Sequence, residues 1–123
     1  RQGKKATLDQ LIRLGKEMIA RFPAVAGVGV ASAGPLDPVS GTLLDPTNFS
    51  GPEGNWGRVP LVKILSKGLK KKVVLENDAA AAILAEVWKG LSKNTQNAMI
   101  LTLGTGLGTA IVANGSLVRG GRH

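Results

Sequence analysis

The sequence predicts an α/β fold, and three observations carry this prediction. Segments in which apolar residues recur with helical spacing alternate with short β-branched segments over roughly the first 90 residues. The last third of the chain carries hairpin signals instead. A glycine-rich turn, Gly104 to Gly108, joins two of the strands expected there. Helices and strands therefore alternate first, and hairpins follow.

The first helix is predicted from about Leu8 to Arg21. Thr7 and Gln10 have the spacing of a capping box, in which the threonine side chain satisfies backbone N–H groups at the helix start. The apolar residues that follow have helical spacing: Leu8, Leu11, Ile12, Met18, Ile19 and Phe22. Pro23 ends this helix. The segment 25–31 then predicts a strand, and because it is small and β-branched on both faces we expect helices to cover both sides of its sheet.

Turn-forming residues define the next segments. Leu36 to Leu44 is expected to be a hairpin, because Pro38 fixes a φ that the turn needs and Gly41 allows a positive φ. The segment 46–57 contains two prolines, three glycines and two asparagines, and is expected to be a loop. Loops of this kind on a rigid scaffold often bind ligands.

The remaining elements follow from the same signals. Helices are expected at 59–69 and 79–89, with Gly90 ending the second, and a short strand is expected between them at 73–75. Strands at 98–103 and 109–113 flank the glycine turn. Asn114-Gly115 is a dipeptide favoured in tight hairpins, so a last strand is expected at 116–118.

Composition favours a globular protein that lies outside the membrane. Apolar residues make up 43% of the 123 residues, and no run approaches the roughly 18 apolar residues of a membrane span. The segment 1–10 lacks the apolar stretch of a signal peptide. Cysteine is absent and the single histidine is His123, so neither disulfides nor a metal site is predicted. We therefore expect a cytoplasmic protein with no membrane partner.

The positive charge raises the question of a nucleic-acid partner. Sixteen lysines and arginines against eight acidic residues give a formal charge of +8. These charges are dispersed, and only Lys70, Lys71 and Lys72 adjoin one another. Aromatic content of 3% leaves few platforms on which bases could stack. A solvated helix end explains the lysine run better than a phosphate-binding patch does, so a basic nucleic-acid-binding domain is the second alternative.

The glycine turn could hold phosphate. Its three alternate glycines free the backbone to present N–H groups to an anion, and neighbouring threonines could offer hydroxyls: Thr102, Thr105 and Thr109. The spacing G-x-G-x-G differs from the dinucleotide fingerprint G-x-G-x-x-G, and no G-K-[ST] of a Walker loop is present. Taken alone, such a turn is more often structural than phosphate-binding.

Three polar residues stand where a strand meets a helix: Glu76, Asn77 and Asp78. Open α/β sheets bind ligands at this kind of junction. Asp78 could simply cap the helix. Alternatively, its carboxylate could accept the proton of a substrate hydroxyl during phosphoryl transfer, a role that depends more on position than on basicity. Small alanines after Asp78 would let a ligand or another element approach.

Three ordered blocks resemble the ROK family of sugar kinases and repressors, close to its glucokinase branch. They are GVGVASAGPLDPVSGTLLDPTNFSG, VVLENDAAAAILAE and LTLGTGLGTAIVANGSLVRGG, and together they run from about Ala24 to Gly121. The resemblance implies part of an actin-like ATPase fold, also called ribonuclease-H-like. It assigns residues 1–95 to the remainder of the N-terminal sugar-kinase lobe and 96–123 to the start of the second, ATP-binding lobe with its phosphate hairpin.

The resemblance also implies the site and the reaction. Asp78 matches the catalytic base, Asn77 and Asn48 match contacts to sugar hydroxyls, and Glu76 is a weaker candidate for such a contact. The second phosphate motif of the family matches Gly104, Thr105, Gly106 and Gly108. The expected reaction is ATP- and Mg²⁺-dependent phosphorylation of a hexose, most simply glucose at its 6-hydroxyl. The expected parent is a homo-oligomer that binds ATP and a hexose.

Several family features differ here or lie elsewhere. The family helix usually begins NDANAA, and Ala80 replaces its second asparagine. The first phosphate loop, D-x-G-G-T, is expected upstream of Arg1, whereas the G-E-x-G-H sugar contacts and the cysteine-rich zinc loop are expected downstream. The isolated chain is therefore expected to be inactive. The main alternative is a sugar-sensing ROK repressor, although residues 1–22 are too short for the winged helix-turn-helix of such proteins.

Overall fold

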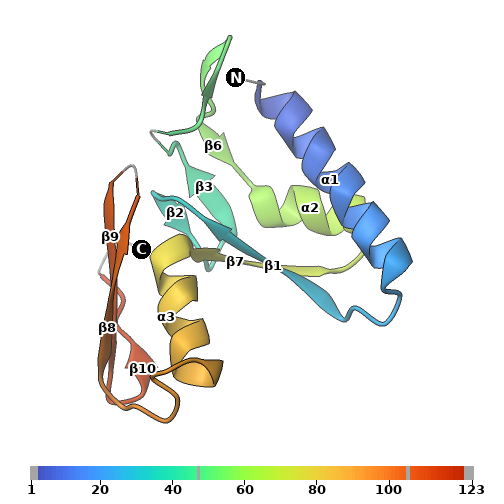
Figure 1. Ribbon diagram of the computed structural model, residues 1–123. Helices are drawn as coiled ribbons and strands as arrows, with labels where there is room; N and C mark the ends of the chain where they lie inside the picture. The colour runs from blue at the N-terminus through green and yellow to red at the C-terminus, as the bar shows by residue number, and fades with distance from the viewer. Residues whose placement is uncertain (1–2, 47, 105, 121–123) are drawn as a thin grey trace. The chain divides into compact units, whose positions relative to one another are not determined.

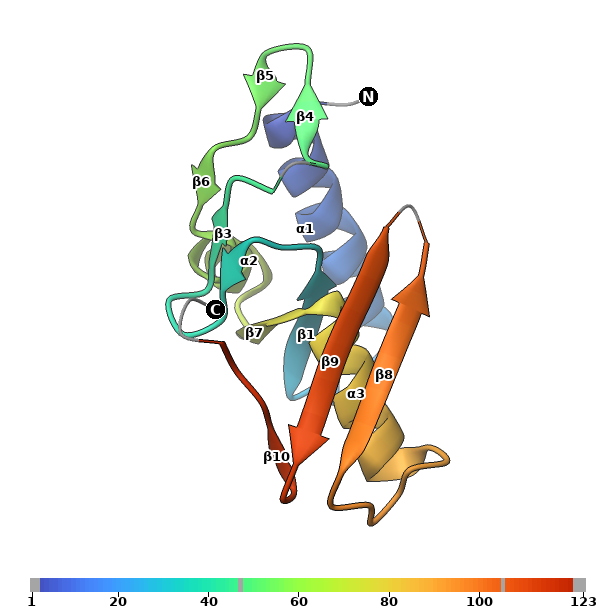
Figure 2. The same ribbon diagram turned by 90° about the vertical axis from the view of Figure 1, so that its left-hand side faces the viewer.

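A computed structural model of the chain describes residues 3–46, 48–104 and 106–120 (Figures 1 and 2). The helices are α1 (Lys4–Arg21), α2 (Leu61–Leu69) and α3 (Asp78–Lys89). The strands are β1 (Gly27–Ser32), β2 (Leu36–Asp37), β3 (Thr42–Leu44), β4 (Ser50–Gly51), β5 (Gly54–Asn55), β6 (Arg58–Val59), β7 (Lys72–Asn77), β8 (Ala98–Leu103), β9 (Leu107–Ala113) and β10 (Ser116–Leu117). The chain forms two compact units, Arg1–Glu76 (unit 1) and Asn77–His123 (unit 2), and each is described by itself.

Unit 1 combines two helices with short strands. Strand β1 pairs with β7, and Gly27 lies beside Lys72, so the two strands begin together and run in the same direction. Strand β3 pairs antiparallel with β2 on one side and with β6 on the other. Strands β4 and β5 form a small antiparallel hairpin inside the segment that the sequence predicted to be a loop.

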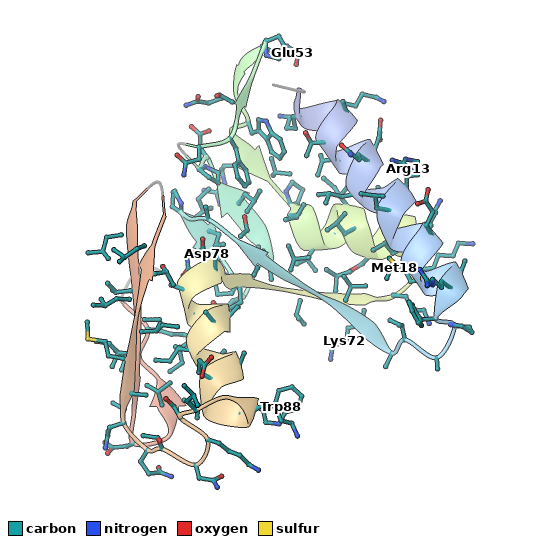
Figure 3. All side chains as sticks on the ribbon, in the orientation of Figure 1. Arg13, Met18, Glu53, Lys72, Asp78 and Trp88 are labelled. Carbon is teal, nitrogen blue, oxygen red and sulfur yellow. The ribbon has the colours of Figure 1, made fainter. Side chains whose placement is uncertain are left out.

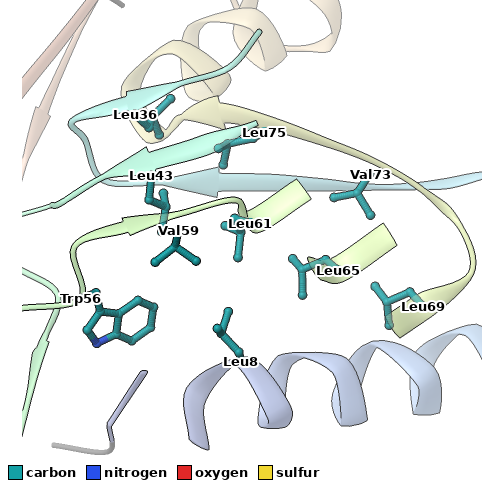
Figure 4. Packing of buried hydrophobic residues seen from close by; sticks show 10 residues of the cluster. All are labelled: Leu8, Leu36, Leu43, Trp56, Val59, Leu61, Leu65, Leu69, Val73 and Leu75. Atoms are coloured by element: carbon teal, nitrogen blue, oxygen red, sulfur yellow. The ribbon is translucent and has the colours of Figure 1, made fainter. Parts of the chain in front are cut away.

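The core of unit 1 lies between the helices and these strands (Figure 4). Its buried members are Leu8, Leu36, Leu43, Trp56, Val59, Leu61, Leu65, Leu69, Val73 and Leu75. Helix α2 contributes a leucine at every fourth position, which is the spacing that places them on one face. Each fully buried leucine stabilises the fold by about 1.5–3 kcal/mol.

Two glycines let α1 and α2 approach closely. A Cβ on Gly15 would lie 2.7 Å from a Leu69 methyl carbon, and a Cβ on Gly68 would lie 2.7 Å from a methyl carbon of Ile12. Both distances are shorter than real Cβ contacts, so a side chain at either position would force the Leu69 or Ile12 side chain to move. Glycine in a helix interior costs about 1 kcal/mol relative to alanine.

The predicted capping box at Thr7 is wrong. Helix α1 begins one turn earlier, with Gly3 as its N-cap and no side-chain cap hydrogen bond. The Thr7 hydroxyl lies inside the helix and donates to the Gly3 carbonyl at 3.2 Å. A threonine side chain can hydrogen-bond a carbonyl four residues back or cap a helix, so the sequence pattern alone does not distinguish these two roles.

On the exposed face of α1, a 2.7 Å hydrogen bond to Asp9 raises the pKa of Lys5.

The burial predicted on both faces of the first strand is also not observed. In β1, Val28 and Val30 pack against the core, whereas Gly27, Gly29 and Ala31 are exposed. Successive side chains of a strand point to opposite faces, and the described residues supply a core to only one of them.

The second helix, predicted to begin at residue 59, begins at Leu61 in the structure because Val59 belongs to β6. Val59 pairs with Leu43 across β3 and β6 and is 2% exposed.

Two predicted turns are confirmed by their backbone angles. Gly41 has φ 66°, and Asn114 and Gly115 have φ 50° and 74°, the left-handed values that the tight hairpin between β9 and β10 requires.

Unit 2 consists of α3 packed on an antiparallel hairpin (Figure 2). Strands β8 and β9 pair from Ala98 opposite Val112 to Leu103 opposite Leu107, and β10 extends the sheet beside β9. Among the described residues of this unit, the buried apolar ones are Ala79, Ala80, Ile83 and Val112. The alternate face of the hairpin exposes Met99, Leu101, Leu103, Leu107 and Ile111. None of the helices in the described ranges has the length and hydropathy needed to cross a membrane.

Lys70 offers a test of the end of α2. It caps the helix with φ 53° and ψ 38°, a left-handed conformation that glycine adopts without steric cost. We expect Lys70→Gly to raise the free energy of unfolding by about 1 kcal/mol in urea denaturation. Lys67→Gly, in the last turn of the same helix, should lower it by about 1 kcal/mol. Loss of stability in both variants would contradict the left-handed cap.

Candidate functional site

The junction between β7 and α3 is closed by Asn77, not by Asp78. Asn77 has φ −64° and ψ 145°, the extended geometry of an N-cap. Its Oδ1 accepts hydrogen bonds from the backbone N–H groups of Ala79 at 3.0 Å and Ala80 at 3.2 Å. The strand therefore ends and the helix begins at the same asparagine. Of the two roles that the sequence left open for Asp78, that of N-cap is filled by its neighbour.

Asp78 is the first residue of α3, and its side chain is exposed (Figure 3). One carboxylate oxygen, Oδ1, accepts a 2.9 Å hydrogen bond from the Ala79 N–H. The partial positive charge of the helix N-terminus favours an anionic side chain at this position. An exposed carboxylate held at a helix start can accept a hydrogen bond from a ligand without first being uncovered.

Strand β9, which follows the glycine turn, passes beside the first turn of the same helix at Gly108. An ideal Cβ on Gly108 would lie 3.5 Å from the Cβ of Ala79 and would collide with the Thr102 hydroxyl on the paired strand. The missing side chain at Gly108 therefore makes room for the Thr102 hydroxyl, and Ala79 lies beside the same strand. Asp78 precedes Ala79, so the carboxylate heads a helix that packs beside the strand following the glycine turn, within the same compact unit.

The open side of the turn suits an anion. Gly104 and Gly106 are exposed, and a Cβ on either would meet nothing within 4 Å. The Gly104 N–H donates to the Gly106 carbonyl at 3.0 Å, which closes the turn. Phosphate oxygens could therefore approach the backbone here without displacing a side chain. The predicted contact at Thr105 lies outside the described residues.

Asn48 and Glu76 belong to unit 1. Asn48 is exposed on a turn in which the Phe49 N–H donates to the Pro46 carbonyl at 3.0 Å. Glu76 is half-buried near the end of β7 and takes part in an interaction of its own. The structure thus gathers Asn77, Asp78 and the glycine turn within unit 2, and it describes Asn48 and Glu76 separately.

The segment that carries Asn48 is closed by a residue that the sequence analysis missed. Asp45 has φ 63°, and its Oδ1 accepts a 2.8 Å hydrogen bond from the Gly57 N–H. An acidic residue before Pro46 gives no sign of a partner twelve positions away. A useful signal would have been that aspartate tolerates left-handed backbone better than most residues do.

No group of three or more histidine, cysteine, aspartate or glutamate side chains that could hold a metal ion occurs among residues 3–46, 48–104 and 106–120. Mg²⁺ in phosphate-transfer sites often needs only one or two protein carboxylates, because the substrate phosphates supply further ligands. The lack of such a group among the described residues is therefore compatible with a phosphate-transfer site.

The sequence matches the ROK family over residues 1–123, so the chain belongs to this family. It is 38% identical over 128 residues to the glucokinase of Thermotoga maritima, which covers 95% of this chain and 39% of that protein. It is 34% identical to a beta-glucoside kinase of Listeria monocytogenes, over 93% of this chain and 37% of that protein. The relatives also include the xylose repressor of Caldicellulosiruptor bescii, 28% identical over 97% of this chain and 30% of that protein.

The likeness extends to three dimensions. A ROK family glucokinase from Streptomyces griseus, solved in complex with glucose and AMPPNP, superimposes with a TM-score of 0.80 at 28% identity. The match covers 98% of this chain and 36% of that chain. The predicted fold class is therefore confirmed: the chain has part of the actin-like ATPase fold of ROK sugar kinases. It spans less than two fifths of the length of these relatives.

The cap at Asn77 can be separated from any contact that its side chain makes to a ligand. Asn77→Ala removes the acceptor of two helix N–H groups and should lower the free energy of unfolding by about 1 kcal/mol. Asn77→Asp keeps an oxygen in the same place and should leave stability close to that of the wild type. Thermal unfolding of both variants measures the difference. Equal losses in the two variants would show that Asn77 does not act as the cap.

Proposed function

We propose that the whole protein containing this chain is a sugar kinase that transfers a phosphoryl group from ATP to a hexose, most simply to the 6-hydroxyl of glucose. One observation carries the proposal: the exposed Asp78 carboxylate heads α3 immediately before the residue that packs on Gly108. A carboxylate at a helix start and an open glycine turn in the same compact unit suit phosphoryl transfer, which needs an acceptor for the hydroxyl proton and a cradle for phosphate. The glucokinase and beta-glucoside kinase relatives support the same reaction class.

Asp78 would orient the attacking hydroxyl. In a loose transition state the proton leaves the hydroxyl late, so the carboxylate contributes mainly by holding the oxygen in line with the phosphorus. Asp78 Oδ1 already accepts the Ala79 N–H, which fixes the carboxylate against the helix start. The remaining lone pairs of the carboxylate can accept the hydroxyl.

Asn77 and Asn48 would contact other sugar hydroxyls. The Oδ1 atom of Asn77 already accepts two backbone N–H groups, and the residue takes part in a further interaction, so its cap role and a sugar contact would be made by one side chain. Asn48 projects from an exposed turn and can offer both a donor and an acceptor. Glu76 is the weaker candidate, because it is half-buried and already engaged.

Gly104, Thr105, Gly106 and Gly108 would form the cradle for the phosphate chain of ATP. When bound, ATP supplies the phosphoryl group and Mg²⁺ neutralises the charge that develops on it. The contribution of this chain is the open backbone at Gly104 and Gly106, where no side chain keeps phosphate at a distance.

The proposal also includes a boundary between the two lobes at residues 95 and 96, a cytoplasmic location and a homo-oligomeric whole protein.

The second candidate is a sugar-sensing repressor of the same family, which the likeness to the xylose repressor favours. A repressor needs a DNA-binding module and sugar binding, whereas a kinase needs turnover. A coupled assay of ADP release with a panel of hexoses separates the two for the whole protein. The isolated 123-residue chain is expected to give no hexose-dependent ADP release, because it spans a minor part of each kinase relative.

Asp78→Asn tests the proposed catalytic role. The amide preserves shape but cannot accept the hydroxyl proton, so kcat of the whole protein should fall by about 10²–10⁴-fold while KM for the hexose changes little. The control is Asp9→Asn, which neutralises an exposed carboxylate on α1 and should leave kcat unchanged. Steady-state kinetics by coupled assay provides both constants. Wild-type turnover in Asp78→Asn would remove Asp78 from the mechanism.

A further inference from the structure

The loop that carries Asn48 is fastened at its two ends. Asp45 and Gly57 both have left-handed backbone, with φ 63° and 65°. The Asp45 Oδ1 atom accepts the Gly57 N–H at 2.8 Å and so joins the start of the loop to its end. We call this contact the Asp45–Gly57 clamp.

The interior of the loop is also held in place. The Phe49 and Trp56 ring centroids lie 4.9 Å apart, and the backbone N–H of Trp56 donates to the Phe49 carbonyl at 3.1 Å. Trp56 itself belongs to the core cluster of unit 1 (Figure 4). The Lys4 ammonium donates to the Trp56 carbonyl at 2.8 Å. Asn48 is therefore an exposed residue on a loop whose flanks are fixed.

The residue type at position 45 suits both demands of the clamp. Glycine would adopt the left-handed backbone but offers no acceptor for the Gly57 N–H. Most other residues would be strained there, whereas aspartate and asparagine tolerate it and carry an oxygen acceptor.

We propose that Asp45 is a positioning residue for hexose binding: through the clamp it holds the turn on which Asn48 faces the sugar. This inference rests on the proposed function, in which Asn48 contacts the sugar. Asp45 acts through Asn48 and touches no reacting atom. Loss of the clamp lets the loop sample other conformations, and the fraction of molecules ready to bind hexose falls.

The effect falls on binding and not on chemistry. Asn48 contacts the hexose equally in the ground state and the transition state, so weakening this contact raises KM and leaves kcat unchanged. Loss of one well-placed hydrogen bond corresponds to about a tenfold rise in KM for the hexose. KM for ATP stays unchanged, because the glycine turn belongs to unit 2.

The test compares three variants of the whole protein. Asp45→Gly keeps the left-handed backbone and removes only the acceptor, so KM for the hexose should rise about tenfold. Asp45→Asn keeps both the left-handed backbone and the acceptor oxygen, so its KM for the hexose should stay within about twofold of the wild-type value. The matched control is Asp37→Gly, which removes another aspartate acceptor, for Val39 and Ser40, in the β2–β3 turn. It should leave KM unchanged.

The outcomes are distinct. The inference is overturned if KM is unchanged in Asp45→Gly, if Asp45→Asn is as impaired as Asp45→Gly, or if Asp37→Gly raises KM equally. Hydrogen exchange of peptides from 45–57 should be faster in Asp45→Gly and not in Asp45→Asn. If the wild-type protein binds hexose but does not phosphorylate it, the kinase proposal is wrong, and the inference about Asp45 is tested by measuring Kd for hexose in the wild type and the variants by calorimetry. If the wild-type protein binds no hexose, both the kinase proposal and the inference are wrong.

Discussion

The packing of Ala79 in α3 beside Gly108 in β9 is the constraint on which the proposed site depends. A Cβ on Gly108 would lie 3.5 Å from that of Ala79, an ordinary van der Waals distance, so the start of the helix lies beside the strand that follows the glycine turn. This packing fixes where α3 begins relative to the glycine turn. Because Asn77 caps the helix, Asp78 is left exposed at its first position. Two elements with no evident connection in the sequence thereby belong to one compact unit, as the proposed site requires.

Much of this arrangement follows from local rules. The hairpin at Asn114-Gly115 was predictable because left-handed backbone at both positions is a local demand that this dipeptide meets. The third helix was predictable from its spacing and from the polar residues before it. The errors have non-local causes: Val59 joins a strand because Leu43 pairs with it, and Thr7 finds a carbonyl acceptor inside a helix that starts earlier.

The residues of the candidate site also fall into those that the sequence indicated and those that it did not. The sequence indicated Asp78 and the glycine turn, since each stands where an element changes. It did not indicate which of Asn77 and Asp78 caps α3, because both residue types cap well and only the backbone geometry decides. It gave no sign of Asp45, whose role depends on a partner at Gly57. The resemblance to ROK proteins supplied the chemical roles that neither spacing nor burial could provide.

The most direct test of the central claim is a disulfide between positions 79 and 108. The Cβ separation of 3.5 Å lies within the range for disulfides, and the chain has no other cysteine. Ala79→Cys with Gly108→Cys, in a Thr102→Ala background that removes the colliding hydroxyl, should cross-link on mild oxidation, as measured by peptide mass spectrometry. Ala79→Cys with Gly106→Cys should not, since nothing lies within 4 Å of a Cβ at 106. Failure of the first pair, or equal linkage of both, would contradict the account.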